Sequence, residues 1–324
     1  MNQASAAEAA GRGRLATFNL FRPGAWRRSA GGAPYLLLAP ALLVLAGVLL
    51  YPMAMLVELS FQHYGLRQLI AHAGEFVGLD NYREVLGDRF FWTVVLRTVA
   101  FAAVNVALTM LIGTLIALLL EKVHRPVRVL LTAGLVLVWA TPVVVAVDLW
   151  QWMFDFEFGV VNWLLTHLGA GNYLHHNWFA NPLQGFAVIT VVVVWGALPF
   201  VVITLSAGLS QVPRDMIEAA EVDGAGGWAI FWHVVAPVLR PVFIILATLS
   251  TIWDFKVFDQ VWVMLNQRPA RDYFLLGIYS FSESFRVTRY GLGATLAVVM
   301  VLILAIATSG YVRHYMGRLG EEAG

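Results

Sequence analysis

The chain has 324 residues, of which 60% are hydrophobic and only 13% are charged, with a formal net charge of +1. An average soluble domain has about 25% charged residues, so this chain has too little charge to cover a water-soluble globule. The near-neutral charge removes any bulk electrostatic attraction to nucleic acid, and the absence of cysteine excludes disulfides, thiolate metal sites and cysteine nucleophiles. We therefore expect an integral membrane protein.

The chain begins with a basic tail, residues 1–34, followed by a long apolar run. The run starts with "PYLLLAPALLVLAG" and continues to Val57 without a cleavage boundary, so an uncleaved first span from Tyr35 to Val57 is favoured over a removed signal peptide. We expect residues 35–91 to contain this first transmembrane helix and a polar loop on the outer side.

Five further stretches are apolar enough to cross a bilayer, which needs about 20 residues of helix to span about 30 Å of hydrocarbon. They run from Phe101 to Leu120, Leu130 to Trp152, Phe186 to Leu209, Val242 to Met264 and Leu292 to Val312. An earlier start of the first of these, near Trp92, would place Arg97 at the membrane interface. The sequence predicts an all-α integral membrane protein with six transmembrane helices, five of them in a core over residues 92–313, before a short tail, 314–324.

Arginine and lysine are unevenly distributed between the two sides of these predicted spans. Twelve lie on the side of the termini: Arg12, Arg14, Arg22, Arg27, Arg28, Lys122, Arg125, Arg128, Arg214, Arg240, Arg313 and Arg318. Seven lie on the other side: Arg67, Arg83, Arg89, Arg268, Arg271, Arg286 and Arg289. Because positive charge accumulates on the cytoplasmic side, both termini are predicted to be cytoplasmic.

A polar patch at about residues 211–237 interrupts the apolar pattern on the cytoplasmic side. Its charges are too costly for hydrocarbon; they are Arg214, Asp215, Glu218, Glu221 and Asp223. Pro213 in a first turn and Gly224 at a left-handed stop are typical of a short helix, and apolar residues at helical spacing from Trp228 to Val235 predict a second one that Pro237 ends. This hairpin is either a solvated loop with an amphipathic helix on the membrane or a plug that enters another protein's groove.

The spacing of this patch resembles a known family motif. Glu218-Ala219-Ala220, three residues, Gly224, nine residues and then Val234-x-Ala236-Pro237 resembles the EAA loop of binding-protein-dependent ABC importers, EAA-x3-G-x9-I-x-LP. Every spacing matches, and Val234 and Ala236 are mild departures at apolar positions. "FVGLDNYREVL", "FEFGVVNWLL" and "WDFKVFDQVWVM" are similar to carbohydrate-uptake permeases related to the larger maltose-transporter permease.

Other parts of this resemblance concern single loops and the solute. "NQRP", at 266–269, departs from the Gly-Gly-Pro stretch of many relatives, which leaves the shape of one outer loop open. The region from Trp253 to Phe281 looks similar to actinobacterial permeases for chitobiose or cellobiose, and it does not fix the sugar.

The resemblance implies a type I ABC importer transmembrane domain, with a cytoplasmic EAA coupling hairpin, in a bacterial plasma membrane. The implied partners are a second homologous permease, two ATP-binding subunits, an extracytoplasmic solute-binding protein on the outer loops, a sugar substrate and membrane lipid, with no nucleic acid. The implied coupling residues are Glu218, Ala219, Ala220, Asp223, Gly224 and Pro237. In the family this hairpin sits in a cleft of the ATPase, so that closure of the ATPase dimer moves the membrane helices.

The chain has no recognisable catalytic motif of its own. A phosphate-binding loop needs Gly-Lys-Ser/Thr, but Lys122 follows Glu121 and Lys256 follows Phe255. We expect no cofactor in this chain, with ATP and Mg bound by the partner ATPase, and no nucleophile–base pair. His175-His176 has no third ligand at suitable spacing, so we expect a loop there and no metal site.

Polar and aromatic residues inside two predicted spans are candidates for the substrate path, because ionisable residues in hydrocarbon are costly. Carboxylates and amides bind sugar hydroxyls, and aromatic rings stack on sugar C–H faces. The resemblance to the maltose permease implies contacts near Trp152, Ser250, Trp253 and Asp254. The full candidate set is Asp148, Trp152, Ser250, Trp253, Asp254 and Gln260, and Asp155 would share a helical face with the first two.

Several alternatives remain open at this stage. Lys256 and Asp259 could simply neutralise one another across one helical turn, and tryptophans such as Trp150 could belong to an interfacial belt. An ion-coupled secondary transporter is a rival function, in which Asp148, Asp254 and Lys256 relay ions. A membrane scaffold whose hairpin only recruits a partner is a second rival.

Overall fold

The computed structural model describes residues 33–322, so the basic tail predicted for residues 1–34 lies outside it except for its last two positions. The chain divides into two compact units, 1–55 and 56–324. The first candidate span, Leu37–Ser60, is built from α1 (Ala33–Leu45), a π-helical turn (Ala46–Leu50) and α2 (Tyr51–Ser60). The strands of the described part are short: β1 (Gln62–His63) pairs antiparallel with β2 (Glu75–Phe76).

Two short helices, α3 (Leu66–Ala71) and α4 (Asp80–Gly87), follow the first span. The buried Asn81 amide on α4 donates to the backbone oxygens of Ser60, at 3.0 Å, and Gln62, at 2.9 Å. The Thr295 hydroxyl also donates to Ser60 O, at 3.1 Å. These bonds satisfy backbone acceptors at the end of α2 and tie that end to α4 and α15.

The second span is the single long helix α5 (Arg89–Lys122), which starts earlier than Phe101. The Asp88 carboxylate accepts a bond from Phe90 N at 2.9 Å and so caps its first turn. The Arg97 guanidinium donates to the backbone oxygens of Arg271, at 3.1 Å, and Phe274, at 3.0 Å. Arg97 is therefore accommodated within the helix by carbonyl acceptors from another segment.

The third predicted span, Leu130 to Trp152, is present as two helices and not as one continuous helix. The chain forms α6 (Arg125–Ala140) and α7 (Val143–Met153), whose axes are bent by 103°. Thr141 is extended, with φ −75° and ψ 126°, because the ring of Pro142 disfavours helical backbone at the preceding residue. The described residues thus contain five helices long and apolar enough to cross a membrane, or six if the bent pair counts as one.

The fourth and sixth spans follow the prediction more closely. Helix α9 (Pro182–Leu209) is capped by the Asn181 side chain, which accepts from Leu183 N at 2.9 Å, and α15 (Tyr290–Glu322) continues past Val312. Short helices α8 (Val160–His167) and α14 (Leu276–Phe281) lie in the loops before them. The largest apolar core lies where α5, α9, α13, α14 and α15 meet, and its fully buried members include Phe91, Ile189, Met264, Leu276 and Leu296.

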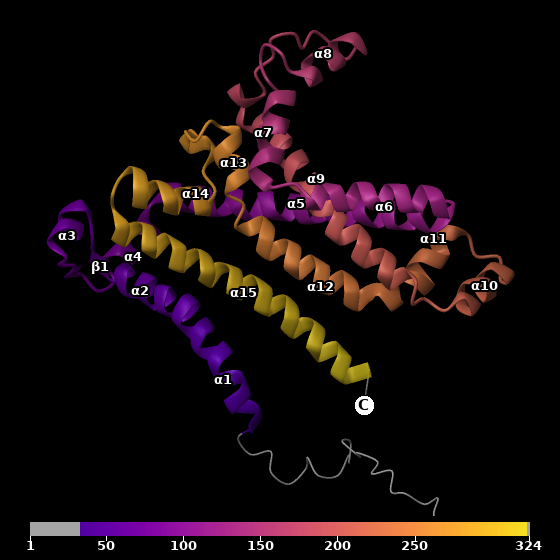
Figure 1. Cartoon of the computed structure of the whole chain (residues 1–324), viewed down its shortest axis with the longest axis horizontal. Coiled ribbons are helices and arrows are strands. Elements are labelled where there is room, and N and C mark those ends of the chain that lie inside the picture. Colours follow the sequence, from indigo (N-terminus) through magenta and orange to yellow (C-terminus); the bar gives the residue numbers. More distant parts are fainter. Residues whose placement is uncertain (1–32, 323–324) are drawn as a thin grey trace, which may run out of the picture. The chain divides into compact units, whose positions relative to one another are not determined.

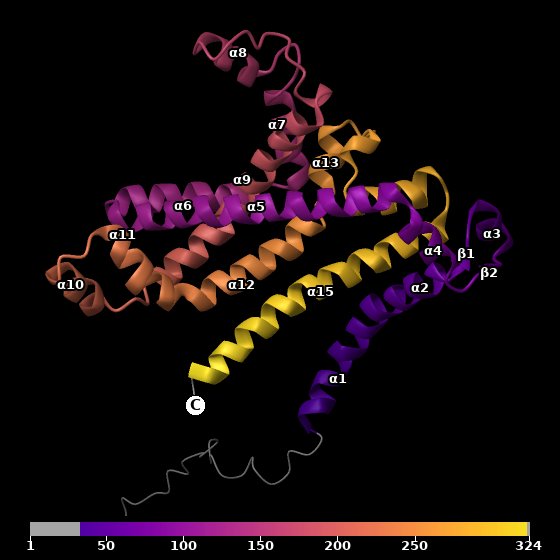
Figure 2. The same cartoon turned by 180° about the vertical axis from the view of Figure 1, so that it is seen from behind.

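The fifth predicted span, Val242 to Met264, has different ends in the structure. A continuous 29-residue helix, Gly227–Phe255, contains α11 (Gly227–Ile230), a π-helical turn (Phe231–Val235) and α12 (Ala236–Phe255). It stops before Lys256, and α13 (Asp259–Met264) is a separate helix. Helices α10 (Arg214–Val222) and α11 lie at one end of α12 and α13 lies at the other, as both views show (Figure 1 and Figure 2).

Candidate functional site

The polar patch forms the predicted helix–turn–helix, with α10 as its first helix. Glu218 and Ala219 are exposed on α10, and Ala220 is half-buried. Asp215 stands in the first turn, where a carboxylate is favoured by the positive end of the helix dipole. The helix therefore presents its acidic residues to solvent.

The turn after α10 is a complete glycine-dependent helix stop. Gly224 has φ +80°, a backbone conformation that side chains rarely adopt. Gly224 N donates to Glu221 O at 3.0 Å, and Ala225 N donates to Ala220 O at 2.9 Å. These two bonds are the paired 5→2 and 6→1 bonds of a Schellman stop, with Asp223 as the exposed C-cap residue. The geometry gives a physical reason for glycine at this position.

The exposed face of α10 also carries apolar residues that were not predicted from the sequence. The Val222 residue is 88% exposed and Met216 is 48% exposed, on either side of Ala219. The three recur at intervals of three, which places them on one side of the helix. This spacing is present in the sequence, but charged residues lie between the three positions, so the apolar side of the helix was not predicted. An exposed apolar stripe with acidic neighbours is suited to contact another protein.

The opposite face of the hairpin is fixed to the long helices. Val212, Ile230, Val235 and Leu239 form a buried cluster, and Ile217 and Ala220 of α10 pack against it. Trp228 and Trp232, which were predicted to share an apolar face with Val235, stay largely exposed. The hairpin is thus packed onto the start of α12 through small and branched residues.

Pro237 does not end a helix, in contrast to the prediction. It lies in the first turn of α12, within the continuous Gly227–Phe255 helix. The π-helical turn before it, where Ala236 N bonds to Phe231 O, shifts the hydrogen-bond register next to a residue that lacks an N–H. The helix therefore continues through Pro237 without a break.

A second candidate site lies near the other end of α12. A pocket of about 330 Å³ is formed by α6, α7, α9, α12 and α13, and it includes four of the predicted substrate-path residues: Ser250, Trp253, Asp254 and Gln260. Residues on both sides of the α6–α7 bend, such as Thr141 and Val143, line it. Gly196 and Ala197 in the lining leave room because their side chains are minimal. The volume is at the lower end of the range for small-molecule sites, about 300–1,000 Å³.

Two buried polar groups in this pocket have no hydrogen-bond partner among the described residues. They are Ser250 Oγ and Asp254 Oδ2, one helical turn apart on α12, in residues that are only 2% and 4% exposed. A buried polar atom without a partner costs about 1–3 kcal/mol, and a charged one costs more. Such atoms in a pocket are suited to accept hydrogen bonds from a hydroxylated molecule.

Aromatic rings form one wall of the same pocket. Phe200 stands between Trp253, at 5.1 Å between ring centroids, and Trp139, at 6.1 Å. Trp195 is also part of the lining. Trp139, Trp195 and Phe200 were not predicted from the sequence, because they come from two other helices and only the fold brings them to Asp254.

The remaining candidates lie outside this pocket. Asp148 and Trp152 on α7 are exposed and do not line it. Asp155 does not share their helical face, because α7 ends at Met153. The Asp155 carboxylate instead accepts bonds from Phe158 N, at 2.9 Å, and Glu157 N, at 2.8 Å, and these bonds lower its pKa.

The suggested neutralisation of Lys256 by Asp259 across one helical turn required both residues to lie on one helix, and they do not. Lys256 follows the end of α12, and Asp259 begins α13, so the two residues do not belong to one helix. Both side chains are exposed.

The fold and the two sites define a multi-pass membrane protein with a protruding acidic hairpin and a small polar pocket among its helices. Residues 109–319 match the family model described as "Binding-protein-dependent transport system inner membrane component". The chain belongs to this family and is a permease subunit of the inner-membrane type. Family membership favours the importer over the ion-coupled transporter that the sequence left open.

Individual relatives agree with this assignment. The chain is 43% identical to the diacetylchitobiose uptake system permease protein DasB of Streptomyces coelicolor, over 91% of this chain and 90% of that protein. It is 32% identical to the sulfoquinovosyl glycerol transport system permease protein SmoG of Agrobacterium fabrum (86% and 88%). It is also 32% identical to the trehalose/maltose transport system permease protein MalF of Thermococcus litoralis (76% and 81%).

A solved structure has the same fold. A chain of a bacterial ABC transporter involved in the import of the acidic polysaccharide alginate matches with a TM-score of 0.72, over 87% of this chain and 95% of that chain. The identity is 19%, so the likeness concerns the fold alone.

Proposed function

We propose that this chain is one membrane-spanning subunit of an ATP-driven importer for a sugar or short oligosaccharide. It forms half of the translocation path beside a second, homologous permease. Two separate ATP-binding subunits supply the energy, and an extracytoplasmic solute-binding protein delivers the solute. ATP binding opens the path outward and hydrolysis resets it inward, the alternating-access cycle.

The observation that carries this proposal is the continuity of one helix between the two sites. The helix Gly227–Phe255 begins at the acidic hairpin and ends at Ser250, Trp253 and Asp254 in the pocket. At 1.5 Å per residue its 29 residues extend about 43 Å. A movement imposed on the hairpin is therefore transmitted to the pocket wall without an intervening loop.

In the proposed orientation the hairpin and both termini are cytoplasmic, in agreement with the positive charge on that side. The exposed stripe Met216, Ala219 and Val222 with Glu218 enters a groove of the ATP-binding subunit, where the carboxylate pairs with a basic residue. The ATP site belongs to that subunit, because neither lysine of this chain lies in a phosphate-binding loop.

The proposed solute is a sugar because of the chemistry of the pocket and the relatives. Carboxylate, hydroxyl and amide groups from Asp254, Ser250 and Gln260 are arranged beside Trp253. The relatives named above transport diacetylchitobiose, sulfoquinovosyl glycerol and trehalose or maltose by their names, so a glycoside with several hydroxyls is the expected class.

The test replaces Asp254 by asparagine in the complete complex, reconstituted in proteoliposomes. The expected result is at least a tenfold loss of sugar uptake with basal ATP hydrolysis retained, since a buried charge-assisted bond is worth about 1.5–3 kcal/mol. The matched control is Asp259→Asn, which removes an exposed carboxylate five residues away and leaves uptake unchanged. Equal uptake by the two variants would refute a substrate role for Asp254.

A further inference from the structure

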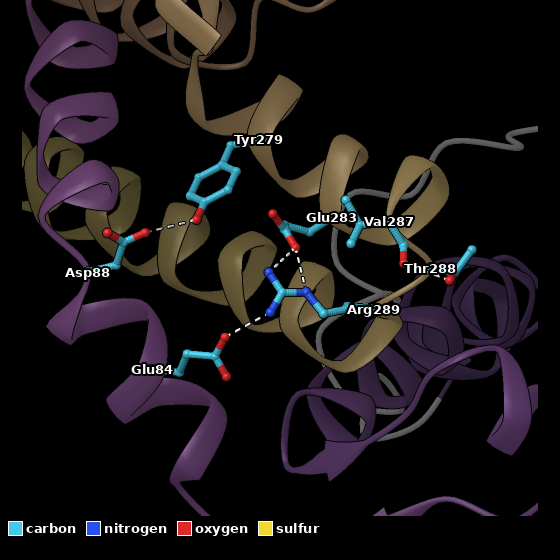
Figure 3. A network of polar contacts seen from close by, with 7 residues as sticks. All are labelled: Glu84, Asp88, Tyr279, Glu283, Val287, Thr288 and Arg289. Atoms are coloured by element: carbon cyan, nitrogen blue, oxygen red, sulfur yellow. Dashed lines mark hydrogen bonds and ion pairs between the residues drawn. The ribbon is translucent and has the colours of Figure 1, made fainter.

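Of the described residues, Asp254 is the one charged residue that is buried. Carboxylates elsewhere have partners even where they are more exposed: Arg289, at the start of α15, pairs with Glu84 at 2.9 Å and with Glu283 at 2.6 Å (Figure 3). Asp254 Oδ2, in contrast, has no hydrogen-bond partner within the described part of the chain. A buried carboxylate without a compensating group is costly, so this arrangement is typical of a site that a ligand completes.

The lining of the 330 Å³ pocket around Asp254 carries charge of one sign only. Asp254 is its sole ionisable side chain, and no Arg, Lys or His of the described residues lines it. The nearest basic residue along the chain, Lys256, is exposed and lies beyond the end of α12. Apolar residues such as Val147 and Val192 make up much of the lining, and surroundings of low dielectric strengthen interactions between charges. An anionic group in this pocket would therefore be repelled by Asp254 and would find only uncharged donors.

Positive charge, in contrast, is compensated in the same pocket. Trp139, Trp195 and Trp253 all line it, and Phe200 stands between two of them. The face of a tryptophan ring attracts a cation through its electrostatic quadrupole. An ammonium group can thus pair with the carboxylate beside these rings, and an uncharged hydroxyl can donate to the same oxygen. The pocket suits a ligand that supplies hydrogen-bond donors and no negative charge.

We propose that Asp254 makes this pocket selective by charge: it admits uncharged sugars and sugars with a protonated amine, and it excludes sugars that carry a carboxylate or another anionic group. The inference rests on the proposed function, which makes the pocket part of the translocation path, and it narrows the class of solute. A sugar hydroxyl or ammonium group donates to Asp254 Oδ2, the Ser250 hydroxyl bonds to the neighbouring sugar oxygen, and the C–H face of the sugar lies against Trp253.

The experiment measures sugar binding to the complete complex in detergent by equilibrium dialysis. The solute-binding protein is left out, because it imposes a selectivity of its own. Three labelled disaccharides of one skeleton are compared. Cellobiose is uncharged, cellobiouronic acid carries a carboxylate, and in chitobiose amines that take up protons replace two hydroxyls.

We expect cellobiouronic acid to bind at least tenfold more weakly than cellobiose, and chitobiose to bind at least as tightly as cellobiose. Tenfold corresponds to about 1.4 kcal/mol, which is less than the repulsion between two unit charges about 4 Å apart in surroundings of reduced dielectric. In Asp254→Asn, which keeps the shape and removes the charge, cellobiose should bind about tenfold more weakly. The preference for cellobiose over cellobiouronic acid should fall below about threefold, because the amide can donate to an anion.

Two control variants separate charge from other effects. Ser250→Ala removes the neighbouring hydroxyl but no charge, so it should weaken both sugars together and leave their ratio unchanged. Asp259→Asn removes an exposed carboxylate outside the pocket and should leave both affinities unchanged.

Equal binding of cellobiose and cellobiouronic acid by the wild type would overturn the selection by charge while leaving the importer intact. The same ratio in the wild type and in Asp254→Asn would overturn it as well, since the carboxyl group would then act without its charge. Failure of all three disaccharides to bind would also overturn it. Absence of ATP-dependent sugar uptake by the complex together with its solute-binding protein would instead overturn the proposed function.

Discussion

Gly224 allows the coupling hairpin to be perturbed through the backbone alone. Its φ of +80° lies in the left-handed region, and no heavy atom lies within 4 Å of the position that a Cβ would take. Gly224→Ala therefore meets no steric obstacle from neighbouring groups. The cost is the left-handed conformation of an L-residue, about 1–2 kcal/mol. Since about 1.4 kcal/mol is a factor of ten, the intact helix stop should become about 5- to 30-fold less populated relative to unravelled forms.

The chain offers a closely matched control at Gly227. That residue begins α11, has no positive φ and also has open space around its Cβ position, so Gly227→Ala adds the same methyl group without strain. Gly224→Asn is a second control, because asparagine tolerates the left-handed region better than alanine. We expect the sugar transported per ATP hydrolysed to be highest in the wild type and Gly227→Ala, lower in Gly224→Asn and lowest in Gly224→Ala.

The assay is the amount of sugar transported per ATP hydrolysed by proteoliposomes that contain the complete complex, with insertion of each variant verified. Hydrogen exchange of the last amides of α10 gives the population of the helix stop directly. We expect Gly224→Ala to hydrolyse ATP with a reduced transport ratio and faster exchange. If Gly224→Ala transports as much per ATP as Gly227→Ala while its exchange is accelerated, the stop is not needed for coupling and the reasoning is wrong.

Three further predictions concern the scaffold. A Cβ at Gly185 would overlap the Tyr273 hydroxyl, which donates to Phe179 O at 2.9 Å. Gly185→Ala should therefore destabilise the protein by about 1–3 kcal/mol, measured by unfolding in detergent. Gly277→Ala, which has open space around its Cβ position, should not destabilise it. Leu246→Ala removes a fully buried side chain and should cost about 2–5 kcal/mol in the same measurement; a value near zero would contradict the packing. Bonds from Phe158 N and Glu157 N lower the pKa of Asp155 below its unfolded value of about 3.9. The turn that these bonds hold is therefore stabilised above that pH and loses this stabilisation as the pH falls through the folded pKa. Proteolysis of the turn should rise as the pH falls through this range in the wild type and stay constant in Asp155→Asn.

The two short helices of the hairpin and the glycine stop between them could be predicted because their signals are local, whereas the role of Pro237 was predicted wrongly. Acidic residues in the first turns, a glycine at the stop and a short apolar repeat each specify backbone geometry within a few residues. The same locality explains why Ser250 and Asp254 could be placed together, since they are one turn apart on one helix. The two residues share one face of the helix wherever the predicted span begins and ends.

Other features depend on tertiary packing or on signals of weak specificity. The bend between α6 and α7 has a local cause at Pro142, but apolar composition alone gave an uninterrupted span. The stop at Lys256 has neither proline nor glycine nearby, so composition gives no warning of it. The wall of Trp139, Trp195 and Phe200 exists only after three helices meet, and Pro237 remains inside a helix because a π-helical turn precedes it.

The central claim is that the hairpin at residues 211–237 lies in the cytoplasm and receives force from a separate ATPase. The chain has no native cysteine, so a single Ala219→Cys variant can be labelled with a membrane-impermeant maleimide. We expect labelling only from the cytoplasmic side, strong protection when the ATP-binding subunits are assembled, and a change in protection when ATP is added. Labelling from outside intact cells, or labelling that is the same with and without the ATPase, would contradict the account.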